Sequence, residues 1–261
     1  MKPGPALVGV LSAILVGLLV TLGGLEEGAP AEDLGTGQMF NRIARRYDLA
    51  NKFMSLGMDQ GWRRGLVAAL ELAPSDRVLD LATGTADVAI LEGAAGPAVL
   101  GVDPSANMLA IGRTKVAAAG LDGTVELALG DATDLEHLAD GGFDKISISF
   151  GIRNIPDVDG ALREMRRVAA PGATLAVMEF CEPTEGVLAP IARLFIKHVV
   201  PRLGALLSGA RWDEYNHLQR SIAAFPPPPA FRSKVERAGF ATRPPVFYAA
   251  GSVALYVGTA N

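Results

Sequence analysis

Small and acidic residues follow a short apolar stretch within residues 77–87. Arg-Val-Leu-Asp-Leu predicts a buried strand, and the Ala-Thr-Gly-Thr-Ala that follows predicts a tight turn before a helix that begins at Asp87. Gly84 can adopt backbone angles that are closed to other residues and lets a ligand approach the main chain. The free N–H groups at the start of the helix favour an anionic or hydrogen-bond-accepting group. Residues 77–87 therefore predict a ligand-binding turn.

A second apolar stretch, residues 98–103, ends in an acidic residue, Asp103. In nucleotide-binding α/β sheets an acidic side chain about 20 residues after the glycine turn binds ribose hydroxyls. Gly84 and Asp103 together predict a site for a nucleoside-containing cofactor.

The elements that must position these residues alternate between strands and helices. Strands are predicted over 77–81, 98–103, 124–129, 143–149 and 173–180, and helices over 62–72, 106–119, 159–168 and 230–238, with a further helix from residue 87. This alternation predicts an α/β fold with parallel strands and right-handed crossovers. Residues 240–248 and 253–257 have no helix between them and predict an antiparallel pair that completes a seven-stranded sheet. Apolar residues at helical spacing near Phe40 predict a helical cap.

Composition excludes several classes of protein. Residues 39–261 carry 23 basic and 24 acidic side chains, without the basic excess of a nucleic-acid-binding protein. Cys181 is the only cysteine, so no intrachain disulfide forms, and the three histidines have no metal-ligand spacing. Neither nucleic acid nor a metal ion is expected as a partner.

The amino-terminal 38 residues are predicted to form a leader and linker, followed by one domain over residues 39–261. Residues 3–25 contain no charged side chain, which fits either a cleaved targeting segment or a retained membrane anchor. Lys2 precedes this segment and four acids follow it, so a simple anchor would place the domain outside the cytoplasm, away from its cofactor. We therefore expect delivery to an organelle, a plastid or mitochondrion, with the protein associated with a membrane.

Residues 186–208 are strongly apolar and are interrupted by Pro190 and Pro201. Two interpretations are open: a buried pair of helices, or a lid that faces a lipidic substrate or a membrane surface.

Six ordered segments carry a resemblance to a known family. They are Met39-Phe-Asn-Arg-Ile-Ala-Arg-Arg-Tyr-Asp48, Leu79-Asp-Leu-Ala-Thr-Gly-Thr85, Ser149-Phe-Gly-Ile-Arg-Asn154, Arg167-Val-Ala-Ala-Pro-Gly172, Glu179-Phe-Cys-Glu-Pro183 and Tyr215-Asn-His-Leu-Gln-Arg-Ser-Ile-Ala-Ala-Phe-Pro226. The sequence resembles the ubiquinone/menaquinone biosynthesis C-methyltransferases, which are class I enzymes with a Rossmann-like fold and use S-adenosylmethionine. The resemblance runs from residue 39 to about residue 258.

The resemblance implies which residues bind S-adenosylmethionine. Gly84 and Thr85 would line the turn beside the methionine moiety, and Asp103 would bind the ribose. Asp131 with Ala132 would hold the adenine edge, and Ser149 would lie under the cofactor. For Asp131 alone, an ordinary turn residue at the end of a strand is the competing interpretation.

The chain departs from the family pattern at Ala86, where the family usually has a glycine. If this position has positive φ, alanine strains the turn by roughly 1 kcal/mol, and its methyl group is expected to crowd the cofactor. The family's usual serine is replaced by Cys181, which we interpret as a small buried residue.

The implied reaction moves a methyl group to a ring carbon of a polyprenylated quinol. The ring becomes nucleophilic when a hydroxyl loses its proton, so the site needs groups that accept or stabilise this change. Arg153 and Asn154 are candidates for binding the quinol oxygens, Asp87 for accepting the proton and Tyr47 for closing the pocket. Competing interpretations are a pairing of Arg153 with a surface acid, a turn at Asn154, a helix cap at Asp87 and a core position for Tyr47.

Three other functions remain open. One is a small-molecule O- or N-methyltransferase, because a fold does not determine a function. A nicotinamide dehydrogenase is weaker, since the turn lacks the full Gly-x-Gly-x-x-Gly pattern. The third, favoured only by Ala86, is a non-catalytic subunit of a quinone-synthesis complex. A homodimer is also compatible with the sequence.

Overall fold

The structure is a computed structural model. It describes residues 57–182 and 220–261, together with Phe40, Asn41, Ala44, Asp48, Asn51, Lys52 and Ser55. The leader, Tyr47 and residues 186–208 lie outside the described residues, so the expectations about them stay predictions. Within the described part, no helix has both the length and the apolar character needed to cross a bilayer.

The centre of the fold is one mixed sheet of eight strands. They are β1 (Arg77–Leu81), β2 (Ala98–Asp103), β3 (Val125–Leu129), β4 (Phe143–Ser149), β5 (Ala169–Phe180), β6 (Phe240–Thr242), β7 (Val246–Tyr248) and β8 (Val253–Ala260). Their order is β3-β2-β1-β4-β5-β8-β6, and β7 also pairs with β8. The first five strands are parallel and β8 runs antiparallel to its neighbours, so the predicted mostly parallel α/β sheet is confirmed.

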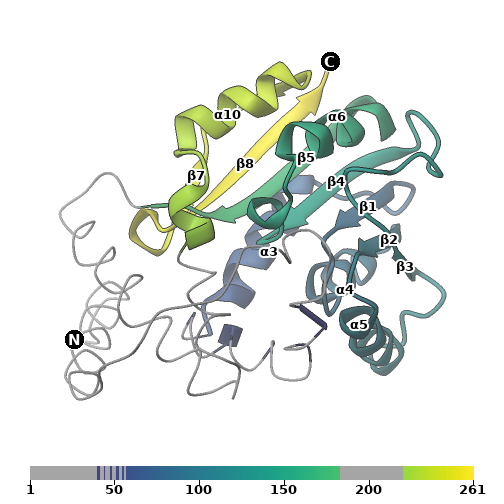
Figure 1. Ribbon diagram of the computed structural model, residues 1–261. Coiled ribbons are helices and arrows are strands. Elements are labelled where there is room, and N and C mark those ends of the chain that lie inside the picture. The colour runs from purple at the N-terminus through teal and green to yellow at the C-terminus, as the bar shows by residue number, and fades with distance from the viewer. Residues whose placement is uncertain are drawn as a thin grey trace, which may run out of the picture.

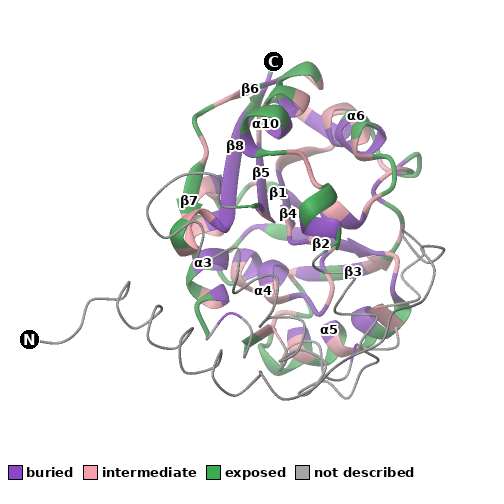
Figure 2. Cartoon of the chain, turned by 60° about the vertical axis from the view of Figure 1, so that its left-hand side comes forward, coloured by how far each residue is buried: buried purple, intermediate pink, exposed green. Residues whose placement is uncertain are grey.

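Helices cover both faces of the sheet (Figure 1). They are α3 (Asp59–Leu70), α4 (Asp87–Gly93), α5 (Ala106–Ala118), α6 (Val158–Val168) and α10 (Pro228–Arg237), with short 3₁₀ helices η1 (Ile152–Asn154) and η2 (Ala249–Gly251). One core cluster joins α6 and α10 to the sheet, and two others join α3, α4 and α5 to the opposite face. Burial is nearly continuous along β8 and from Leu175 to Glu179 of β5, as expected for strands covered on both faces (Figure 2).

The carboxyl-terminal strands differ from the sequence prediction in one respect. The strand expected over 240–248 is divided into β6 and β7 by Pro244 and Pro245, because proline has no N–H to donate to the ladder. These two short strands pair with different parts of β8. The last strand in the sequence lies inside the sheet, between β5 and β6, a position that the sequence prediction did not specify.

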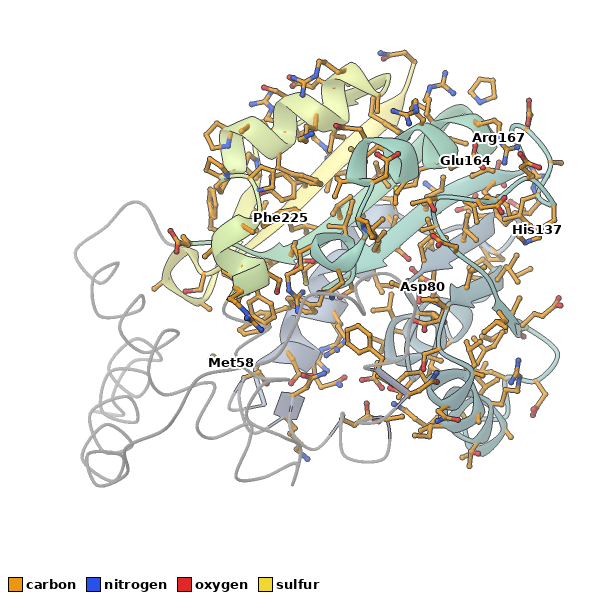
Figure 3. All side chains as sticks on the ribbon, viewed as in Figure 1. Met58, Asp80, His137, Glu164, Arg167 and Phe225 are labelled. Atoms are coloured by element: carbon orange, nitrogen blue, oxygen red, sulfur yellow. The ribbon has the colours of Figure 1, made fainter. Side chains whose placement is uncertain are left out.

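Two carboxyl side chains are buried between the sheet and α4. Asp80, labelled in Figure 3, is 1% exposed, and its Oδ1 accepts a hydrogen bond from Ser147 Oγ on β4 at 2.8 Å. Glu92 on α4 is fully buried, and neither of its carboxyl oxygens has a hydrogen-bond partner among the described residues. Burial, with a smaller contribution from repulsion by Asp103, raises the pKa of Asp80 to about 6. Burial and the nearby Asp80 charge raise the pKa of Glu92 well above its ordinary value.

Gly151 lies where the segment after β4 meets the turn after β1. A Cβ atom at this position would lie 2.4 Å from the Cβ of Ala82, closer than two carbon atoms can pack. The absence of a side chain therefore lets the carboxyl ends of β1 and β4 approach each other.

We predict that Gly151→Ala lowers the free energy of unfolding by about 1–3 kcal/mol, because the added methyl group overpacks this contact. Gly123→Ala is the matched control, since a Cβ at Gly123 has no neighbour within 4 Å. Urea denaturation of both variants measures the difference. Equal midpoints for the two would contradict the contact.

We also predict that the buried carboxyls make the protein less stable as the pH rises. The folded-state pKa values of Asp80 and Glu92 lie above their unfolded values, so their contribution is complete below the unfolded values, about 4, and is lost as the pH rises through the raised ones, which for Asp80 is about 6. Glu92→Gln should therefore increase the free energy of unfolding more at pH 8 than at pH 5.

Glu164→Gln is the control for this measurement, because the opposite sign is expected. Its hydrogen bond with Arg167 lowers the pKa of Glu164. Glu164 therefore contributes stability above its unfolded pKa, and its loss should weaken the protein more at pH 8 than at low pH. Denaturant titrations at several pH values measure the difference between the variants. Parallel plots of the free energy of unfolding against pH for wild type and Glu92→Gln would exclude a raised pKa of Glu92 in the folded state.

Candidate active site

The turn after β1 has left-handed backbone angles at every second residue. The φ values are 50° at Ala82, 58° at Gly84 and 66° at Ala86. A left-handed conformation costs an alanine about 1–2 kcal/mol, so two such residues in one turn store considerable strain. Ala86 thus has the positive φ that was considered as a condition for strain, and nothing in the sequence indicated that Ala82 shares it.

The expectation that the methyl group of Ala86 crowds the cofactor is wrong. Ala86 is fully buried and belongs to the core cluster that joins α4 and α5 to the sheet. A Cβ at Gly112 of α5 would lie 3.2 Å from the Ala86 Cβ, so the methyl group faces this helix. Its packing offsets part of the strain at this position.

Asp103 connects the turn to the next strand. Its Oδ2 accepts a hydrogen bond from the backbone N–H of Gly84, and its Oδ1 accepts one from the N–H of Ser105, each at 2.8 Å. Ser105 in turn caps α5 by accepting a bond from the N–H of Met108. Asp103 is 7% exposed, and burial raises its pKa while the two backbone donors oppose the shift. Each oxygen has one further lone pair for a hydroxyl group.

Asp131 and Ala132 follow β3, as predicted, but they differ in environment. Asp131 is exposed, and its Oδ1 accepts hydrogen bonds from the backbone N–H and the hydroxyl of Thr133, both at 2.8 Å. This is the local turn that the competing interpretation described. Ala132 is 8% exposed and packs into the core beside Val102. Their adenine contacts stay a prediction.

The residues at the ends of β1, β2 and β4 fit S-adenosylmethionine. The hydroxyl of Ser149 is buried and has no hydrogen-bond partner within the described part of the chain. Among the described residues, a Cβ at Gly84 would have only one neighbour within 4 Å, the Ala82 carbonyl oxygen at 4.0 Å, so this part of the protein leaves the turn open to a ligand. With the free lone pairs of Asp103, these features provide a polar site at the carboxyl ends of adjacent strands, where α/β sheets bind their ligands.

Asp87 belongs to a charged network at the start of α4. The Lys115 ammonium donates to its Oδ1, and the Arg63 guanidinium lies 4.0 Å from its Oδ2. Lys115 also donates to Thr85 Oγ1 at 3.1 Å and to Asp48 Oδ2 at 3.0 Å, and the Thr85 hydroxyl donates to Asp48 Oδ1 at 2.7 Å. The hydroxyl of Thr85 is therefore engaged within the protein. Asp87 is paired with two cations, and its role as a proton acceptor stays a prediction.

Arg153, at the middle of η1, forms an ion pair in the interior. Its Nη1 donates to Glu179 Oε1 at 2.6 Å and to the Phe150 carbonyl oxygen at 2.7 Å. The side chains of Arg153 and Glu179 are 7% and 0% exposed, so the partner is a buried acid rather than the surface acid considered above. Burial raises the pKa of Glu179, although the Arg153 charge and three N–H donors act in the opposite direction. Asn154, also buried, follows Arg153 and ends η1.

Two aromatic rings separate Arg153 from Arg63. The rings of Phe150 and Phe180 are 4.6 Å apart, the Arg63 guanidinium lies 5.7 Å from the Phe150 ring, and that of Arg153 lies 5.3 Å from the Phe180 ring. Phe150 has φ of 58°, which is rare for a bulky side chain. The segment after β4 is therefore strained and tightly packed, and it lies against the cofactor turn through Gly151.

Several residues of this region were not predicted as site residues. Glu179 and Lys115 were missed because their partners are distant in sequence, at Arg153 and Asp48. Asn41 was missed for the same reason: its side-chain oxygen accepts bonds from Ser105 Oγ and the Asn107 N–H and so ties the amino-terminal segment to α5. Asn41 and Glu179 are polar residues of family-like segments, which was the only signal for them, and Lys115 lies in none of these segments.

A groove of about 830 Å³ is lined by the first residues of β1, β2, β3 and β4, at the amino ends of these strands. None of the predicted site residues lines it. The described residues also contain no group of three acidic, histidine or cysteine side chains that could hold a metal ion.

Comparisons with known proteins give the same assignment. Residues 30–260 match the model of the ubiE/COQ5 methyltransferase family. A demethylmenaquinone methyltransferase of Thermus thermophilus is 45% identical over 208 residues, covering 78% of this chain and 92% of the relative. The ubiquinone/menaquinone biosynthesis C-methyltransferase UbiE of Xanthomonas axonopodis is 41% identical, covering 78% and 81%.

Solved structures share the fold at lower identity. A SAM-dependent methyltransferase of Thermotoga maritima superposes with a TM-score of 0.58 at 19% identity, over 87% of this chain and all of the other. One from Mesorhizobium loti gives 0.54 at 18% identity, over 75% and 96%. The predicted class I fold and S-adenosylmethionine as cofactor are confirmed. The chain belongs to the ubiE/COQ5 methyltransferase family.

Proposed function

We propose that this protein methylates a ring carbon of a polyprenylated quinol, with a demethylmenaquinol as the first candidate substrate. The observation that carries the proposal is the 45% identity to a demethylmenaquinone methyltransferase across nearly its whole length. The polar site at the ends of β1, β2 and β4 supports it, because it provides a place for the cofactor next to Arg153 and Asn154.

S-adenosylmethionine, when bound, supplies an electrophilic methyl group. The carboxylate of Asp103 would bind its ribose hydroxyls, and the hydroxyl of Ser149 and the open backbone at Gly84 would line its other side. The two backbone N–H groups that hold Asp103 fix the orientation of this carboxylate before a ligand arrives.

The acceptor ring needs a cationic group near its oxygen. Arg153 is held by Glu179 and the Phe150 carbonyl through Nη1, while its Nε is buried and has no partner among the described residues. The Nε–H is therefore a donor available to a quinol oxygen, and its charge would favour loss of the phenolic proton. Because both Arg153 and Glu179 are buried, Arg153→Ala would leave an unpaired charge; this variant is a poor test of the role.

The interpretation as a non-catalytic subunit is now supported only by the strain at Ala86, because the methyl group of this residue packs into the core. We further propose that the protein contacts a membrane, where a polyprenylated substrate is found. The organellar location and a homodimer or a larger complex remain predictions from the sequence.

Calorimetric titration of S-adenosylmethionine into the full-length protein is the first test, and we expect a dissociation constant in the micromolar range, roughly 1–100 μM. Methyl transfer is then measured with a demethylmenaquinol and with a methoxybenzoquinol. We expect turnover with the first at least. Cofactor binding without turnover on either quinol would reject the substrate and retain the fold-level assignment.

Asp103→Asn should weaken binding of S-adenosylmethionine by about tenfold or more, because a charge-assisted hydrogen bond to the ribose becomes a neutral one. Asparagine keeps the size of the side chain and one acceptor oxygen for the turn. Asp144→Asn, at an acid that pairs with Arg77 at the opposite ends of the strands, is the control. Equal dissociation constants for the two variants would remove Asp103 from the cofactor site.

A further inference from the structure

Glu179 lies beneath the acceptor side of the site but has not been assigned a role. It is on β5, fully buried, and accepts three hydrogen bonds: from Arg153 Nη1 at 2.6 Å, from the Phe180 N–H at 2.7 Å and from the Arg153 N–H at 3.3 Å. Two of these donors belong to Arg153, one in its side chain and one in its backbone. Glu179 therefore restrains both the side chain and the backbone of Arg153.

The same Arg153 atom that contacts Glu179 also contacts the backbone at Phe150. Nη1 donates to the Phe150 carbonyl at 2.7 Å, so Glu179, Arg153 and Phe150 form a continuous chain of contacts from β5 to the end of β4. Phe150 has the left-handed φ of 58°, and such a conformation in a bulky residue persists only when its surroundings hold it. The Arg153 guanidinium supplies one of these restraints, and the Phe150 N–H, which donates to Met178 at 2.8 Å, supplies another.

Stability alone does not explain why this ion pair is buried. A buried pair of charges gains little or nothing over apolar residues of similar volume, because desolvation opposes the attraction. What the pair does provide is a fixed geometry for a loop that begins directly after Ser149 and touches the cofactor turn at Ala82.

We propose that Glu179 is a positioning residue for methyl transfer: through Arg153 it holds the strained loop 150–154 in the conformation that presents the acceptor against the cofactor. Glu179 is fully buried and touches neither substrate nor cofactor; it acts through Arg153. The inference rests on the proposed function, since it assigns the loop to the acceptor side of that site.

Glu179→Gln is the test, since glutamine keeps the volume and an acceptor oxygen and removes the charge. Glu164→Gln is the matched control: Glu164 forms an ion pair with Arg167 at 2.7 Å, and both lie on α6, away from the site (Figure 3). Hydrogen exchange of peptides that cover residues 150–155, the dissociation constant of S-adenosylmethionine, and kcat and KM with a demethylmenaquinol are measured for each.

We expect exchange in this loop to be roughly tenfold faster in Glu179→Gln and unchanged in Glu164→Gln. The value of kcat should fall by about tenfold or more while KM and the cofactor dissociation constant change by less than about threefold, because geometry rather than binding is lost. Unchanged exchange would overturn the inference, and so would faster exchange with wild-type kcat, which would make the contact structural only.

A double variant, Glu179→Gln with Arg153→Met, covers the case in which the single variant does not fold. It contains no unpaired charge and should fold, yet it should exchange rapidly in the loop and turn over slowly. Wild-type loop protection and kcat in this variant would overturn the inference. Failure of the proposed function is separate: it appears as a wild-type protein that methylates neither quinol, whereas the exchange measurement requires no substrate.

Discussion

The carboxylate of Asp103 is the contact on which the geometry of the site depends. It receives the N–H of Gly84 from the turn after β1 and the N–H of Ser105 from the residue that caps α5. One side chain thus fixes the relative positions of two strand ends and a helix start. The turn needs this support because it contains two alanines in a left-handed conformation. The same carboxylate is the group that we propose to bind the ribose of the cofactor.

Buried ionisable side chains occur in two different environments in this protein. Arg153 and Glu179 form an ion pair, and the Glu179 carboxylate accepts further hydrogen bonds, so the pair is tolerated in the interior with little net effect on stability. Among the described residues, Asp80 accepts a hydrogen bond from Ser147 but forms no ion pair, and Glu92 has neither, so their environment favours the protonated form. The ion pair between Arg153 and Glu179 restrains the loop next to the site. Asp80 and Glu92 place two titratable carboxyl groups at β1, the strand that leads into the turn with Gly84.

Local patterns were sufficient to predict most of the architecture. Apolar stretches such as 77–81 and 98–103, separated by a helical segment, lead to parallel strands whose ends meet, so Gly84 and Asp103 could be placed together, whereas Ser149 was placed with them only by the family resemblance. Contacts between distant residues could not be predicted, because nothing in residue 179 indicates its partner at 153. The direction in which a side chain points could not be predicted either: Ala86 lies in the turn, but its methyl group faces α5. The division of the strand at Pro244 could have been predicted, since proline has no N–H to donate to the hydrogen bonds between strands.

The position of β8 inside the sheet affects how the chain folds as it leaves the ribosome. β5 pairs with β8 over seven residue pairs, from Thr174 with Thr259 to Phe180 with Val253. More than 70 further residues must be synthesised after β5 before β8 can pair with it. Until then, the backbone N–H and C=O groups on the β8 side of β5 form an open edge with which other chains can pair. A nascent chain of this protein thus exposes an aggregation-prone strand for several seconds at ordinary translation rates, roughly 5–20 residues per second. Such an intermediate is a natural client for chaperones that bind nascent chains at the ribosome.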